Sequence, residues 1–218
     1  SLALIGGSGS GKSTMLRVMS GLAEPTEGQV LYEGTDLIKA STEERREILK
    51  RIGILFQSSG LLASMTLAEN IALPLETYTS LNANQIMKLV RMKLGALGLK
   101  DYDDFLPSEI SGGMKKRAGL ARALALDPDI LFFDEPSAGL DPSTSAALDH
   151  LIKELNSILG VTMIVVTHEL PSIFEIAQRV IMLDKTEHGI IAQGTVEELK
   201  DSDDKRVADF FNRVPAEY

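Results

Sequence analysis

The chain has 218 residues, of which 22 are lysine or arginine and 31 are aspartate or glutamate, so its formal net charge is −9 at pH 7. A hydrophobic fraction of 44% excludes disorder as its main state, and the acidic balance disfavours a nucleic-acid binder, because phosphate-binding surfaces are usually basic. The sequence contains no cysteine, which excludes a disulfide scaffold, a cysteine-ligated zinc site and a catalytic thiol.

Short apolar runs recur along the chain and predict strands that are covered on both faces, as in a parallel sheet. In chain order they are Leu2–Ile5, Ile52–Phe56, Ile130–Phe133, Met163–Val166 and Val180–Leu183. Helical patterns between them begin at Lys12, run from about Asn84 to Leu97, and span Pro142–Leu159. This alternation of strands and helices predicts an α/β fold with right-handed crossovers.

Residues 58–125 interrupt the alternation, because they show helical patterns and loops but no convincing strand. We expect them to form an α-helical lobe inserted into a core made of residues 1–57 and 126–218. Asn82 and Gln85, at the start of one of these helices, match a capping box. Near the end of the chain, Val207, Phe210 and Phe211 recur at helical spacing, so we expect a short helix within residues 201–218.

A glycine-rich segment between the first predicted strand and helix matches the pattern G-x-x-x-x-G-K-[ST]. In such a loop the backbone N–H groups point at phosphate oxygens, and the helix N-terminus adds positive potential. Lys12 can reach the β- and γ-phosphates, and the Ser13 hydroxyl can ligate Mg²⁺. The predicted phosphate-binding residues are Gly6, Gly7, Ser8, Gly9, Ser10, Gly11, Lys12, Ser13 and Thr14.

Two acids, Asp134 and Glu135, follow the predicted strand Ile130–Phe133. They would lie at the carboxyl edge of the sheet, where open α/β sheets bind their ligands. Asp134 would hold Mg²⁺, directly or through water, and Glu135 would orient or deprotonate the attacking water. Together with the phosphate loop they predict one metal–phosphate site.

The segment Ser111-Gly112-Gly113 precedes another helical run. Backbone N–H groups exposed there could bind a second anion, although in isolation a plain helix cap is the better explanation of the segment. We expect the basic run that follows, Lys115-Lys116-Arg117, to be a solvated helix face.

The motifs together resemble the nucleotide-binding subunit of ABC transporters, and the resemblance covers essentially the whole chain. Besides the phosphate loop and the acidic pair, Gln57 resembles the Q-loop glutamine and residues 111–113 resemble the signature motif. The segment 137–141, which ends at Asp141, resembles the D-loop, and His168 resembles the switch histidine.

This resemblance implies a RecA-like P-loop NTPase core that hydrolyses ATP with Mg²⁺. Two copies of the domain would face each other head to tail, so that Ser111, Gly112 and Gly113 complete the ATP site of the partner copy. Gln57 would contact Mg²⁺ together with Ser13 and Asp134. Glu135, His168 and Gln57 would form the catalytic set, with His168 at the γ-phosphate and the water, and Asp141 would link the two sites.

The sequence departs from the family pattern in two places. The family usually has opening strands and an adenine-stacking aromatic residue before the phosphate loop, but only five residues precede Gly6. We therefore expect these elements in sequence upstream of residue 1. Met114 stands where glutamine is commonest, and Ile110 where leucine is usual.

Within the family, the chain most resembles the lipid-transport ATPases of the Mla/Mce type. The segments that carry this resemblance are residues 56–62, 69–75, 111–114 and 204–211. It implies a phospholipid or another hydrophobic cargo, a transmembrane permease, a second ATPase copy and an Mce-type substrate-binding protein, and no nucleic acid. The expected place is the cytoplasmic face of the inner membrane, or the stromal side of the chloroplast inner envelope.

Two other functions would leave the same ATPase motifs. One is the ATPase of a cell-division-type complex that signals through a membrane partner, and the other is the ATPase of an importer for a polar solute. The identity of the membrane partner distinguishes them. A nucleotide-binding regulator without hydrolysis is a third alternative, and Glu135 argues against it.

Overall fold

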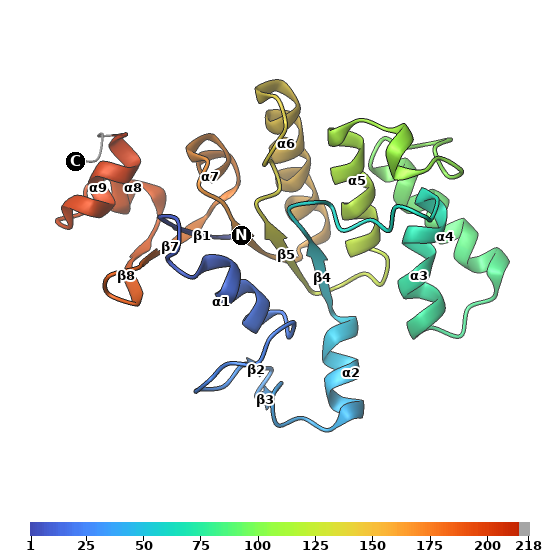
Figure 1. Ribbon diagram of the computed structural model, residues 1–218, viewed down its shortest axis with the longest axis horizontal. Helices are drawn as coiled ribbons and strands as arrows, with labels where there is room; N and C mark the ends of the chain where they lie inside the picture. Colours follow the sequence, from blue (N-terminus) through green and yellow to red (C-terminus); the bar gives the residue numbers. More distant parts are fainter. Residues whose placement is uncertain (214–218) are drawn as a thin grey trace.

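The computed structural model describes residues 1–213, and within this range six strands form the main sheet in the order β4-β5-β6-β1-β7-β8 (Figure 1). The strands are β1 (Leu2–Gly6), β4 (Ile52–Leu55), β5 (Ile130–Asp134), β6 (Thr162–Val166), β7 (Arg179–Asp184) and β8 (Gly189–Gly194). All neighbours pair in parallel except β8, which runs antiparallel to β7. The five predicted strands are confirmed, but the sheet is mixed rather than wholly parallel because β8 adds an edge.

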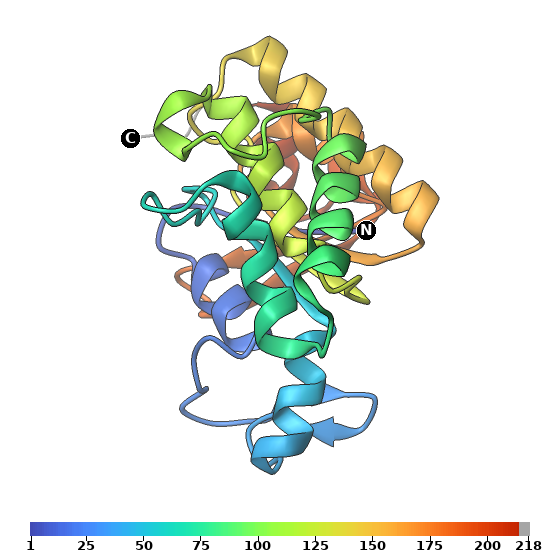
Figure 2. The same ribbon diagram turned by 90° about the vertical axis from the view of Figure 1, so that its right-hand side faces the viewer.

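Helices cover both faces of this sheet. In chain order they are α1 (Lys12–Met19), α2 (Thr42–Lys50), α3 (Leu67–Tyr78), α4 (Ala83–Ala96), the 3₁₀ turn η1 (Pro107–Glu109), α5 (Gly112–Ala123), α6 (Pro142–Leu159), α7 (Leu170–Ile176), α8 (Val196–Lys200) and α9 (Lys205–Asn212). Figure 1 shows α5, α6 and α7 along one face and α1 on the other. The short hairpin of β2 (Leu31–Tyr32) and β3 (Thr35–Asp36) lies with α2 at one end of the molecule (Figure 2).

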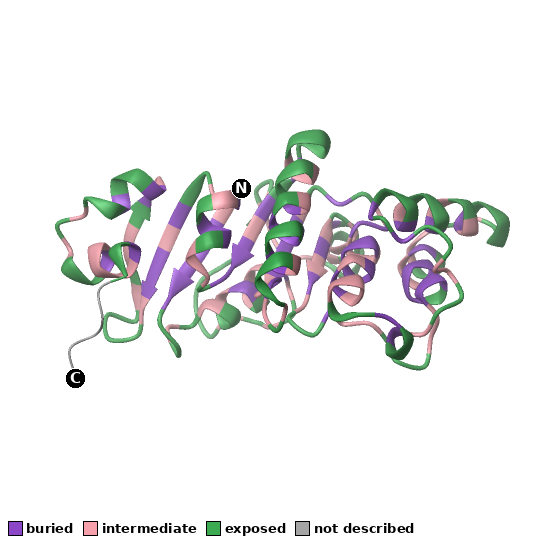
Figure 3. Ribbon diagram, turned by 90° about the horizontal axis from the view of Figure 1, so that it is seen from above, coloured by how far each residue is buried: buried purple, intermediate pink, exposed green. Residues whose placement is uncertain are grey.

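The strands are apolar throughout because successive side chains enter different cores. On β5, Phe132 packs with Leu16 of α1, whereas Phe133 packs with Leu148 and Ile152 of α6. Figure 3 shows buried residues along the strands and exposed residues on the outward sides of the helices. A strand buried on both faces has no room for alternating polar residues, which explains the unbroken runs in the sequence.

The described residues between β4 and β5 form α3, α4, η1 and α5 and contain no strand. The predicted helix near Asn84 is α4, and the capping box at its start is confirmed by reciprocal bonds between Asn82 and Gln85. The division into a core and an inserted lobe stays a prediction. Of the residues expected around the terminal helix, 205–212 form α9, and 214–218 lie outside the described residues.

No helix within residues 1–213 combines the length and the apolar character that crossing a membrane requires.

Asn70 ties the loop before α3 to that helix from a fully buried position. Its Oδ1 accepts a hydrogen bond of 2.7 Å from the Leu62 N–H. Its Nδ2 donates to the carbonyls of Leu62, Met65 and Thr66 at 3.1, 3.1 and 2.9 Å. One amide side chain therefore satisfies backbone groups that would otherwise lack partners in this loop.

Replacing Asn70 by leucine, which has a similar volume, removes these bonds. We expect Asn70→Leu to lower the free energy of unfolding by about 1–3 kcal/mol, measured by urea denaturation. The control is Asn84→Leu at an exposed position of α4, which should change it by less than about 0.5 kcal/mol. Equal stability of the two variants would contradict this role of Asn70.

Candidate functional site

The candidate residues gather at the carboxyl edge of the sheet because three parallel strands end there. In β6, Val166 pairs with Leu4 of β1 on one side and with Asp134 of β5 on the other. The residues that follow these strands therefore leave the sheet at one level. This register brings the phosphate loop, the acidic pair and the segment that carries His168 side by side.

The phosphate loop runs from Gly6, the last residue of β1, to Lys12, the first residue of α1. It curls around the Lys12 ammonium, which donates to the carbonyls of Gly6 and Gly7 at 2.8 and 3.0 Å. A Cβ added at Gly6 would lie 2.3 Å from the Leu183 carbonyl oxygen. Gly11 has a φ of +92°, in the left-handed region that favours glycine. The tight turn therefore depends on its glycines.

The loop offers space and donors for phosphate. Cβ atoms added at Gly7, Gly9 or Gly11 would meet nothing within 4 Å, so the backbone is open on its outer side. Among the described residues no side chain caps α1, which leaves its first N–H groups available to an anion. The Ser10 hydroxyl is buried and finds no hydrogen-bond partner within residues 1–213. These features fit the phosphates of a nucleotide.

Ser13 and Asp134 lie together although 121 residues separate them in the sequence. The Ser13 hydroxyl donates to Asp134 Oδ1 at 3.2 Å. The described part of the chain contains no group of three or more His, Cys, Asp or Glu that could hold a metal alone. One or two protein oxygens fit Mg²⁺, which takes its remaining ligands from water and substrate phosphates.

Glu135 and His168 face each other across the ends of β5 and β6. His168 Nδ1 lies 2.8 Å from Glu135 Oε1, and the side chains are 64% and 14% exposed. Glu135 has a φ of +46°, which is unfavourable for a residue with a Cβ. Strain of this kind is often found at functional sites. A carboxylate held in this way can orient or deprotonate a water.

Gln57 lies at the same edge, where it lines an open pocket together with Asp134, Ala138 and Gly139. The sequence prediction for the neighbouring basic run is wrong at Lys116, which is only 5% exposed and is not part of a solvated face. Its ammonium donates to the carbonyls of Gln57 and Glu135. Sequence reasoning missed this residue because a run of basic residues does not show which of them faces inward.

The predicted signature segment does not contact the phosphate loop of its own chain. Ser111 caps α5, and its Oγ accepts a bond of 3.3 Å from the Met114 N–H. A Cβ added at Gly113 would lie 2.5 Å from Thr144 Cγ2 at the start of α6. Figure 1 places α5 on the other side of β4 and β5 from α1. The segment therefore adjoins the loop that carries Asp141, and not the phosphate loop.

The loop before α6 is held by hydrogen bonds at both of its ends. Ser137 Oγ donates to Asp149 Oδ1 at 3.0 Å, and Ser172 Oγ donates to Asp149 Oδ2 at 2.6 Å. Burial raises the pKa of Asp149, and the two serine hydroxyls oppose this rise. Asp141 caps α6, and its bonds from the Thr144 hydroxyl and N–H lower its pKa.

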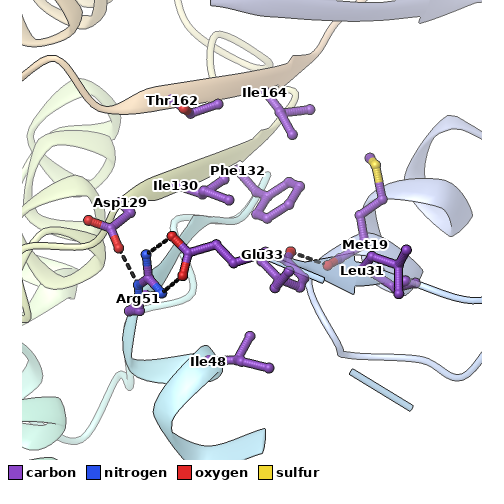
Figure 4. Close-up of a pocket in the computed structure, with 12 residues that line it drawn as sticks. Met19, Leu31, Glu33, Ile48, Arg51, Asp129, Ile130, Phe132, Thr162 and Ile164 are labelled. Atoms are coloured by element: carbon purple, nitrogen blue, oxygen red, sulfur yellow. Dashed lines mark hydrogen bonds and ion pairs between the residues drawn. The ribbon is translucent and has the colours of Figure 1, made fainter. Parts of the chain in front are cut away.

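A second pocket, of about 420 Å³, lies between the β2–β3 hairpin and the sheet (Figure 4). Apolar side chains such as Phe132 and Ile164 line it. At its rim the Arg51 guanidinium pairs with the carboxylates of Glu33 and Asp129. Its lining includes none of the predicted site residues, so this pocket is separate from the phosphate site.

Residues 1–138 match the family model for ABC transporters. The chain is 42% identical over 208 residues to the intermembrane phospholipid transport system ATP-binding protein MlaF of Haemophilus influenzae, with 95% of this chain and 78% of that protein covered. MlaF of Escherichia coli K12 is 42% identical over 213 residues, 97% of this chain and 78% of the relative. The probable ribonucleotide transport ATP-binding protein mkl of Mycobacterium tuberculosis is 41% identical over 209 residues, 96% of this chain and 58% of that protein.

The fold is also similar to solved ATP-binding cassettes. One is a dimeric cassette in a post-hydrolysis state bound to ADP and Pi, with a TM-score of 0.79 and 31% identity. The match covers 89% of this chain and 84% of that one. Another is cbiO1 from Clostridium perfringens, part of the ABC transporter complex cbiONQ, with a TM-score of 0.78 and 28% identity, and with 89% of this chain and 76% of that one covered.

Asp149 and Asp141 predict opposite pH effects on stability. The pKa of Asp149 is raised in the folded state, so protonation of this carboxyl favours folding. The buried carboxylate therefore destabilises the folded state most at neutral pH, where it is charged. Asp149→Asn should therefore gain stability relative to the wild type at about pH 7, and this gain should shrink as the pH falls toward about 4.

The control is Asp141→Asn. The pKa of Asp141 is lowered in the folded state, so its carboxylate contributes stability above its unfolded pKa and loses that contribution as the pH falls. This variant should be less stable than the wild type at neutral pH and approach it in acid. Urea denaturation at several pH values measures both differences, and the same sign for both variants would contradict the assignment.

Proposed function

The chain belongs to the ABC transporter family and hydrolyses ATP, and from that premise we propose that it powers the movement of phospholipid or another hydrophobic molecule at a membrane. The observation that carries this proposal is its 42% identity to MlaF proteins, which are named for intermembrane phospholipid transport, over 95% of the chain. The mycobacterial relative is named for ribonucleotide transport, at 41% identity, so a polar cargo is the second candidate.

In the proposed reaction a water attacks the γ-phosphoryl group in line with the leaving ADP. Glu135 orients or deprotonates this water, and its contact with His168 at 2.8 Å supports that role. His168 holds the γ-phosphate and the water. Lys12 and the N–H groups at the start of α1 stabilise the negative charge on the phosphates.

Mg²⁺ would be held by Ser13 and Asp134, whose oxygens lie 3.2 Å apart, with Gln57 at the same edge. When bound, the ion neutralises phosphate charge. The residues of this chain would position the water and the phosphates around the ion. The open backbone beside Gly9 and Gly11 supports close approach of the phosphates.

The functional unit is a pair of these chains. Residues 111–113 adjoin α6 and lie across β4 and β5 from the phosphate loop of their own chain, which supports a role in the site of a second copy. The similar cassette bound to ADP and Pi is dimeric. In this arrangement Ser111, Gly112 and Gly113 meet the γ-phosphate bound by the partner, and Asp141 links the two sites.

The pair works beneath a transmembrane permease at the cytoplasmic face of the inner membrane. A membrane-anchored substrate-binding protein of the Mce type completes the complex. This chain hydrolyses ATP, and the membrane subunits bind and move the cargo. The identity of those subunits therefore distinguishes a lipid transporter from a solute importer or a cell-division-type complex.

Glu135→Gln tests the catalytic assignment. The amide keeps the size of the side chain but cannot accept the proton of the water, so we expect the turnover number to fall by about 10²–10⁴-fold. ATP affinity should change little, because the phosphate loop is intact. Phosphate release measures turnover, and equilibrium binding of a fluorescent ATP analogue measures affinity.

The matched control is Glu187→Gln in the turn between β7 and β8, where the exposed side chain pairs with Arg206. This variant should turn over ATP at the wild-type rate. Wild-type turnover in Glu135→Gln would remove Glu135 from the proposed role.

The cargo proposal is tested by purifying the full-length subunit from its own membranes in mild detergent. Mass spectrometry then identifies the proteins and the lipids that accompany it. A permease, an Mce-domain protein and enriched phospholipid are expected. A solute permease or a division-type partner without lipid enrichment would overturn the lipid function and leave the ATPase assignment unaffected.

A further inference from the structure

Lys116 is a buried lysine placed between two parts of the catalytic site. It lies in the second turn of α5, separated from the signature segment by Met114 and Lys115, and only 5% of it is exposed. Its Nζ donates to the Gln57 carbonyl at 2.6 Å and to the Glu135 carbonyl at 3.3 Å. One ammonium therefore joins the segment after β4 to the segment after β5.

The same side of α5 holds the backbone after Gln57 at two further points. A Cβ added at Gly119 would lie 2.6 Å from the Ser59 carbonyl oxygen, so helix and loop are in close contact there. The Arg122 guanidinium donates to the Gly60 carbonyl. Positions 116, 119 and 122 are three residues apart and share one side of the helix. We call this side, Lys116 with Gly119 and Arg122, the α5 clamp.

The Glu135 backbone needs support, because its φ of +46° lies in the left-handed region. For a residue with a Cβ this conformation is unfavourable, because the Cβ lies too close to the following carbonyl oxygen. Its N–H donates to the Val166 carbonyl at 2.9 Å, and its carbonyl accepts from the Ala138 N–H at 3.2 Å. Lys116 adds a charged donor to that carbonyl.

The charges around Lys116 fit a fixed ammonium. Burial lowers its pKa, whereas the charges of Asp134, Glu135 and Glu169 raise it. Burying an ammonium costs less free energy when carbonyl acceptors and carboxylates lie close to it than when it has no partner. Removing the ammonium would take from the Gln57 carbonyl its bond to Lys116 and would leave the Glu135 carbonyl with the bond from the Ala138 N–H.

We propose that Lys116 is a positioning residue for Glu135: by bonding the carbonyls of Gln57 and Glu135, it holds the catalytic carboxylate in register with the segment after β4 and with the signature helix. Lys116 does not touch the reacting atoms. It acts through the Glu135 backbone, whose orientation sets the direction of the carboxylate toward His168. The inference rests on the proposed role of Glu135.

The position of α5 gives this link a second consequence. The helix begins at the signature segment that serves the partner copy, and two turns of it carry the α5 clamp. Any displacement of α5 relative to the sheet would therefore act on the Gln57 and Glu135 carbonyls through Lys116. The catalytic carboxylate would be aligned only while α5 is seated.

The test compares Lys116→Met and Lys116→Arg in the full-length protein, purified with its membrane partners. Methionine keeps a long apolar side chain without a donor, and arginine restores a charged donor. For Lys116→Met we expect the turnover number to fall at least about tenfold, because small displacements of a catalytic group carry large penalties. The KM for ATP should change by less than about twofold.

For Lys116→Arg we expect a turnover number within about threefold of the wild type. The matched control is Lys115→Met on the same helix, whose half-buried side chain makes neither of the two carbonyl bonds, and it should turn over normally. ATP affinity is compared between Glu135→Gln and the double variant Glu135→Gln with Lys116→Met, in which hydrolysis does not interfere. The two affinities should agree within about twofold.

Three results would overturn the inference. Lys116→Met could turn over ATP at the wild-type rate, or Lys116→Arg could be as slow as Lys116→Met. A loss of turnover matched by an equal loss of ATP affinity in the double variant would show a general packing defect instead. Normal turnover in Glu135→Gln would refute the proposed function of Glu135 itself, so the two failures are distinguishable.

Discussion

The site depends on the parallel pairing of β1, β5 and β6. Parallel strands end at one edge, so the residues that follow them meet there whatever their distance in the sequence. Leu4, Val166 and Asp134 are paired across the three strands. One face of these strands is buried against α1, and the other is buried against α5 and α6 at β5 and β6 and against α7, α8 and α9 at β1. This burial sets the register, because a shift by one residue would move every buried side chain to the opposite face of the sheet.

At this edge, two lysine side chains hold backbone carbonyls. Lys12 donates to two carbonyls of the phosphate loop, and Lys116 donates to the carbonyls of Gln57 and Glu135. Carbonyl groups that leave a strand need donors, and a lysine that supplies them fixes the path of the chain. These bonds therefore fix the path of the phosphate loop and of the segments that carry Gln57 and Glu135.

The phosphate loop precedes α1 and the signature segment precedes α5, and β4 and β5 lie between these two helices. Ser111 caps its helix and Gly113 packs near Thr144, so these residues have structural roles even without a second copy. In the proposed pair, a composite site would divide the binding of ATP from its hydrolysis, since the nucleotide would dock on one chain and react when two chains close. Cargo recognition lies outside this arrangement, which explains why lipid and solute transporters can share one ATPase design.

The sequence by itself determined the elements whose signals are local. Strands buried on both faces appear as unbroken apolar runs, the glycine-lysine-serine pattern identifies the phosphate loop, and the capping box at Asn82 marks the start of α4. It did not predict β8, which lies at the edge of the sheet beside β7 and has mostly partly buried or exposed residues. It also placed Lys116 on a solvated surface. That lysine is buried because α5 docks against a segment 59 residues earlier in the chain, and no local pattern records which side of a helix such a contact selects. The burial of Lys116 and the left-handed backbone of Glu135 were decided by the tertiary structure alone. Both depend on groups that come together only when the helices pack against the sheet.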